Sequence, residues 1–162
     1  MKHPIALTMN TMTTPPILTL QPGAMSFDDL RRVWLAPTPV ALSGDCAAVI
    51  EASAATVQAI VAKGDPAYGI NTGFGLLAKT QIPTHELERL QRNLILSHAV
   101  GTGEDVSDSV ARLVLLMKAA SLARGYSGVR RVVIDTLLAL LNAGASYVYW
   151  EGHLLRRVMG ET

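Results

Sequence analysis

The chain has 162 residues, a length typical of one domain. Hydrophobic residues make up 49% of it and charged residues only 17%, against about 25% in an average soluble domain, which excludes an intrinsically disordered chain. The 14 basic and 13 acidic residues are spread evenly and leave a net charge of +1, which argues against a nucleic-acid partner. The apolar excess suggests a surface that a partner or further sequence covers.

The compartment is indicated by cysteine content and by the absence of targeting signals. The single cysteine, Cys46, can form no internal disulfide and no zinc cluster, which suits a reducing environment. Asn10 and Thr11 break the first apolar run before it reaches the length of a signal peptide. Because Asp135 and Asn142 interrupt the most apolar stretch, no run of about 18 apolar residues occurs. We therefore expect a soluble cytoplasmic chain with no membrane partner.

The first elements in chain order are short. Residues 1–16, rich in Thr, Met and Pro, are expected to form a loose extension. A short strand is expected over residues 17–20. Ser26 is a helix N-cap whose following acidic residues suit the positive end of a helix that runs to about Trp34.

Longer helices make up the rest. Ser43 or Asp45 opens an Ala-rich helix that runs to Lys63 and is stopped by Gly64. Apolar residues spaced by three and four predict three more helices, from Thr84 to His98, from Ser107 to about Gly125 and from Ser127 to Asn142. The last helix is apolar around most of its girth, so something outside these four helices should cover it. The predicted fold class is mainly α, with short strands near the N-terminus.

The segment from Tyr68 to Gly75 is a glycine-rich loop, since it also contains Gly69 and Gly73. Glycines permit positive φ and close backbone approach, so a loop that places a tyrosine beside them is a candidate active site. The alternative is a structural connection whose glycines form turns. The glycine spacing fits neither dinucleotide-binding nor P-loop patterns, which argues against nucleotide binding.

His98 follows Leu87 by eleven residues and therefore lies on the apolar face of its helix. A buried histidine with a satisfied ring explains this position better than a site residue does, on the pattern alone. The other histidines, His3, His85 and His153, show no metal-ligand spacing. The sequence therefore indicates no metal site.

Four motifs favour the active-site interpretation of the glycine loop and of His98 over the structural one. They are Tyr68–Gly75 (YGINTGFG), Leu90–Leu94 (LQRNL), Leu96–Gly103 (LSHAVGTG) and Ser121–Arg130 (SLARGYSGVR). Together they resemble the N-terminal region of histidine ammonia-lyase, in the aromatic amino-acid ammonia-lyase family. The resemblance runs from about Ile17 to Ala145. It implies the N-terminal helical domain of that family, truncated before the central helical bundle that forms a homotetramer.

The resemblance implies a lyase that converts L-histidine to urocanate and ammonia in histidine breakdown. Such enzymes use a methylidene-imidazolone ring made from their own Ala-Ser-Gly, because the β-proton is weakly acidic and ammonia is a poor leaving group. The resemblance makes Tyr68 the catalytic base and His98 a substrate-binding residue, and Ser97 beside His98 resembles the histidine-specific subgroup. The mobile loop that closes over the site contains Gly69, Asn71, Gly73 and Gly75.

The chain departs from the family after Ala145. The Ala-Ser-Gly expected there is absent, and residues 146–162 form a divergent tail, as a shifted reading frame or rearranged gene end would give. Leu42-Ser43-Gly44 is a similar tripeptide, but Ser43 is expected to be a helix N-cap rather than a ring precursor.

We therefore expect residues 17–145 to be a lyase fragment that is inactive alone. The alternatives are a lyase or aminomutase for phenylalanine or tyrosine, a non-catalytic truncated homologue that associates with full-length subunits, and an unrelated glycine-loop binding module.

Overall fold

A β–α–β unit begins the structure. The computed structural model describes residues 16–98, 106–144, 149–150 and 153–154. Strand β1 (Leu18–Leu20) pairs in parallel with β2 (Val40–Leu42), and helix α1 (Phe27–Leu35) connects them. The expected strand over residues 17–20 is confirmed, whereas β2 was not expected. The extension over residues 1–16 lies, except for its last residue, outside the described part.

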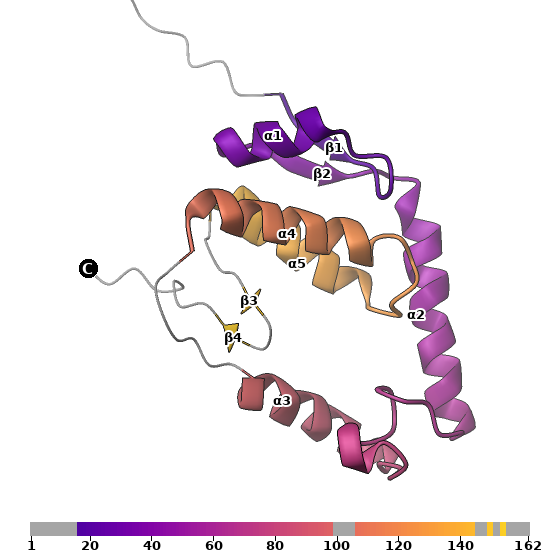
Figure 1. Ribbon diagram of the computed structural model, residues 1–162. Coiled ribbons are helices and arrows are strands. Elements are labelled where there is room, and N and C mark those ends of the chain that lie inside the picture. Colours follow the sequence, from indigo (N-terminus) through magenta and orange to yellow (C-terminus); the bar gives the residue numbers. More distant parts are fainter. Residues whose placement is uncertain (1–15, 99–105, 145–148, 151–152, 155–162) are drawn as a thin grey trace, which may run out of the picture.

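Four longer helices follow. In Figure 1, α4 (Asp108–Leu122) and α5 (Arg131–Asn142) run side by side beneath the β–α–β unit. Helix α2 (Cys46–Lys63) leads down one side to the glycine loop and α3 (Leu87–His98), which lie apart from the other helices. The mainly α fold class is confirmed. Short 3₁₀ turns precede α3, and two-residue strands β3 (Tyr149–Trp150) and β4 (His153–Leu154) pair antiparallel near the C-terminus.

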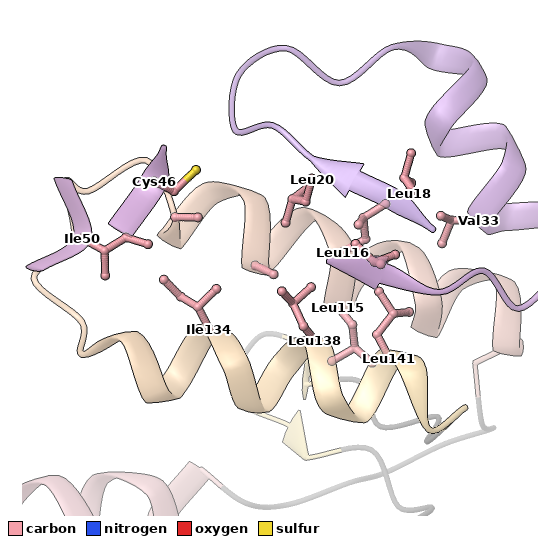
Figure 2. Close-up of a cluster of buried hydrophobic side chains, with 13 residues drawn as sticks. Leu18, Leu20, Val33, Cys46, Ile50, Leu115, Leu116, Ile134, Leu138 and Leu141 are labelled. Carbon is pink, nitrogen blue, oxygen red and sulfur yellow. The ribbon is translucent and has the colours of Figure 1, made fainter. Parts of the chain in front are cut away.

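The hydrophobic core lies between α4, α5 and the β–α–β unit (Figure 2). Leu20, Leu116 and Ile134 are fully buried there, and Ile50 adds the start of α2. Core side chains thus come from both ends of the described sequence. The apolar face of α5 is buried against α4 and the strand pair, while Val132 and Val133 stay exposed, and cover by something outside the four helices remains a prediction for that side.

Local signals set most helix ends. Ser26 caps α1, as expected, and does so in a capping box: its hydroxyl accepts the N–H of Asp29 and the Asp29 carboxylate accepts the N–H of Ser26. Ser107 caps α4, and Gly64 ends α2 with a φ of 79°. These three predictions are confirmed.

The expected cap at Ser127 is wrong, and of the two residues expected to open α2 it is Asp45, not Ser43, that takes the N-cap position. The N–H of Ser43 donates to the Leu20 carbonyl and prolongs the strand pairing, so α2 begins at Cys46. The N–H of Gly128, next to Ser127, donates to the Ser53 hydroxyl at 2.9 Å, and α5 begins only at Arg131. In both places a tertiary bond holds the backbone outside helical geometry.

Two polar side chains attach the β–α–β unit to the helices. The Asn142 amide accepts the N–H of Val40 and donates to its carbonyl, both at 2.8 Å. Arg112 of α4 donates to the carbonyls of Val33 and Trp34 at 2.8 Å each, which satisfies open carbonyls in the last turn of α1.

Helix α2 is mostly outside the core. Within the described residues it is buried only at Cys46 and Ile50, and burial raises the pKa of the Cys46 thiol. The stretch Gly44–Lys63 has a mean hydropathy of 1.4, and by length and composition it could cross a membrane. One such helix is weak evidence for a membrane span.

Gly128→Ala should destabilise the fold. Gly128 has a φ of +67°, and an added Cβ would lie 2.2 Å from a Val57 methyl group of α2. We expect the free energy of unfolding to fall by about 2 kcal/mol. Urea denaturation followed by circular dichroism measures it. Gly44→Ala, with no atom within 4 Å of the new Cβ, is the control, and equal stability of both variants would contradict the contact.

Asn142→Ala should loosen the strand pair from α5. The substitution leaves the N–H and carbonyl of the buried Val40 without these partners, so we expect a loss of about 1–3 kcal/mol. Thermal unfolding compares it with Thr136→Ala, which removes a hydroxyl bonded only to the Val132 carbonyl of the same helix. A melting temperature no lower than that of the Thr136 variant would refute the role of Asn142.

Candidate functional site

Tyr68 lies in a tight turn just after α2. The N–H groups of Ile70 and Asn71 donate to the Ala67 carbonyl at 3.1 and 3.2 Å, so the turn places Tyr68 at its outer side. The residue is 67% exposed. Its ring contacts Phe74 edge-on, with centroids 6.0 Å apart and an interplanar angle of 74°. Tyr68 is therefore accessible to a small molecule from solvent.

The base of the glycine loop is held together by hydrogen bonds. Thr72 and Gln81 form an antiparallel bridge, and the N–H of Gly73 donates to the Thr80 carbonyl at 2.9 Å. The Gln81 amide also donates to the carbonyl of Gly64, the residue that ends α2, at 2.6 Å. Thr72 is almost fully buried. The loop is thus closed on itself and joined to α2, while its mobility stays a prediction.

The glycines have structural reasons to be there. A Cβ on Gly73 would lie 2.6 Å from the Cβ of Leu77 and 2.8 Å from its carbonyl oxygen, so no larger residue fits without a shift. Gly69 and Gly75 adopt φ of 75° and 57°. The turn-forming role of the glycines is compatible with a catalytic loop, because the same turns position Tyr68.

A groove of about 370 Å³ adjoins the loop. Its lining comes from α2 and from three segments that carry the family resemblance. The lining residues include Val57 of α2, Gly69 and Ile70 of the loop, Leu87 and Gln91 of α3, and Gly128 before α5. The sequence gives no sign of this meeting, since Gly128 lies far along the chain from the loop. Residues of the first, second and fourth motifs are therefore neighbours in space, although they are distant in sequence.

His98 lies at the opposite end of α3 from this groove. It is the last residue of the helix, eleven positions after Leu87, or about 16 Å along the axis. The described backbone therefore does not bring His98 close to the loop that carries Tyr68. The His98 side chain and residues 99–103 of the third motif lie outside the described part.

Ser43 does not fit the ring that the resemblance implies. Leu42 belongs to β2, and both the N–H and the carbonyl of Ser43 are used, by the Leu20 carbonyl and the Cys46 N–H. Closing a ring here would break the strand pairing and the start of α2. The tripeptide Leu42-Ser43-Gly44 is a structural turn.

The described residues also form a second groove, away from the loop. A second groove of about 510 Å³, which the sequence gave no reason to expect, lies between the β1–α1 turn and the start of α2, and Asp45, Arg124 and Tyr126 are polar groups at its edge. The Arg124 guanidinium lies 5.5 Å above the Tyr126 ring. Across the described ranges, no cluster of three His, Cys, Asp or Glu side chains is placed to hold a metal ion.

Known proteins resemble the chain in sequence and in fold. Histidine ammonia-lyase of Enterobacter sp. (strain 638) is 55% identical over 126 residues, which cover 78% of this chain and 25% of that protein. The solved histidine ammonia-lyase of Trypanosoma cruzi superposes with a TM-score of 0.70 at 32% identity, over 79% of this chain and 25% of its own. Tyrosine aminomutase of Streptomyces globisporus gives 0.74 at 26% identity, over 80% and 24%.

The chain thus spans about a quarter of the length of these relatives. The aromatic amino acid lyase family matches residues 25–152, which include the loop, α3 and the segment before α5. The match continues past Ala145, the predicted start of the divergent tail. That boundary stays a prediction. On this match over most of its length, the chain belongs to the aromatic amino acid lyase family.

Proposed function

We propose that this chain is the N-terminal part of a cytoplasmic, homotetrameric histidine ammonia-lyase, which converts L-histidine to urocanate and ammonia. The observation that carries the proposal is the 55% identity to a histidine ammonia-lyase over 126 residues. The exposed Tyr68 on a hydrogen-bonded loop supports it, because a base must reach a substrate from a fixed position.

In this proposal Tyr68 removes the β-proton and His98 contacts the substrate. The loop that carries Tyr68 adjoins the start of α3, whereas His98 is the last residue of that helix, so a site formed around Tyr68 needs other groups. These groups come from the part of a lyase outside this quarter, or from another subunit. The electrophilic ring has the same source, because Ser43 does not fit it and the sequence contains no Ala-Ser-Gly. The chain by itself is then inactive.

Complementation tests this function. The purified chain is mixed with the remaining portion of a homologous lyase, and urocanate formation from L-histidine is measured by absorbance. We expect activity in the mixture, none from the chain alone, and a loss of about 100-fold or more for Tyr68→Phe because the base is removed. Tyr126→Phe, at a tyrosine that is 84% exposed, should keep the activity. Activity of the Tyr68 variant equal to that of the Tyr126 variant would exclude the base role.

A second candidate is a lyase or aminomutase for tyrosine or phenylalanine, which the likeness to tyrosine aminomutase favours. The same mixture supplied with L-tyrosine or L-phenylalanine distinguishes it from a histidine enzyme, because only the matching amino acid is consumed.

A third candidate is a non-catalytic homologue that associates with lyase subunits. The exposed length of α2 supports it, since Val49 is 48% exposed there. Co-purification with an intact lyase without any gain of activity would favour this reading over the first.

A further inference from the structure

Asn71 is a buried amide within the glycine loop. Its side chain is 3% exposed. The Oδ1 atom accepts the N–H of Ala67 at 2.7 Å, and the Nδ2 group donates to the carbonyl of Asp65 at 2.9 Å. Its main-chain carbonyl accepts the N–H of Ile82 at 2.8 Å. Because both partners of the Asn71 side chain are main-chain groups, its amide fixes the path of the backbone here.

The bonds of Asn71 surround Tyr68. Ala67, directly before Tyr68, is held at both main-chain groups, since its N–H donates to Oδ1 and its carbonyl accepts the Asn71 N–H. Asp65 is where the chain enters the loop and Ile82 is where it leaves. One residue therefore ties the entry, the turn and the exit together.

Within the described part of the chain, the Tyr68 side chain lies open to solvent. It is 67% exposed, and its ring contact is the edge of Phe74, which belongs to the same loop. The direction of the phenol therefore depends on the backbone that carries it. A change in the Ala67–Asn71 turn moves the phenol oxygen, whereas the hydrophobic core around α4 and α5 is not involved.

We infer that Asn71 is a positioning residue that fixes the backbone beneath Tyr68 and so sets where the phenol oxygen meets the substrate. The inference rests on the proposed function, in which Tyr68 is the base. A loop residue with only a structural role would alter stability without altering the placement of Tyr68.

The first test uses the 162-residue chain alone. Asn71→Ala is compared with Asn71→Asp, which keeps the acceptor for Ala67, and with Gln58→Ala, which removes an exposed amide from α2. We expect amide hydrogen exchange at Ala67 to rise at least about tenfold in the alanine variant and less in the aspartate variant. The nuclear Overhauser effect between the Tyr68 and Phe74 rings should weaken, while exchange in α4 and α5 stays unchanged. An unchanged Ala67 exchange rate or ring contact would overturn the inference.

The second test uses the complemented lyase. Misplacement of the base predicts that Asn71→Ala lowers kcat at least about tenfold while KM changes less than about twofold. A rise in KM alone would overturn the positioning role. Tyr68→Phe separates the two proposals: if that variant keeps full activity, the proposed function fails. Exchange at Ala67 and the ring contact still decide whether Asn71 places Tyr68.

Discussion

The packing of α4 against α5 is the contact on which the rest of the structure depends. Leu116 and Ile134 are fully buried at this contact, and β1, β2, α1 and the start of α2 all add side chains to the same core (Figure 2). Three-residue strands and a nine-residue helix are too short to be stable alone. They persist because apolar contacts and the polar links from Arg112 and Asn142 hold them on the two helices.

The candidate site lies away from that core, at the far end of α2 (Figure 1). The helix connects the two regions, and the close approach of Gly128 to Ser53 and Val57 fixes its middle. The loop keeps its own shape through bonds among its residues. The local geometry around Tyr68 is therefore set within the loop, whereas its position relative to the core is set by α2.

Part of the apolar excess of the composition is exposed at the loop and α3. Leu76 and Leu77 of the loop and Ile95 and Leu96 of α3 are all more than half exposed. The last helix, α5, buries its inner face against α4 but also leaves Val132 and Val133 exposed. Exposed apolar side chains around the loop and α3 agree with a chain that spans a quarter of the length of its relatives.

The sequence by itself determined the helices, the caps at Ser26 and Ser107, the glycine stop at Gly64 and the lyase motifs, because each depends on residues within a few positions. Only the tertiary structure decided that β2 pairs with β1 and that Ser43 and Ser127 do not cap helices. The partners responsible are distant: Gly128 and Ser53 are 75 positions apart, and Asn142 and Val40 are 102 apart. No local pattern encodes such a pairing, since the backbone must first be brought together by the core.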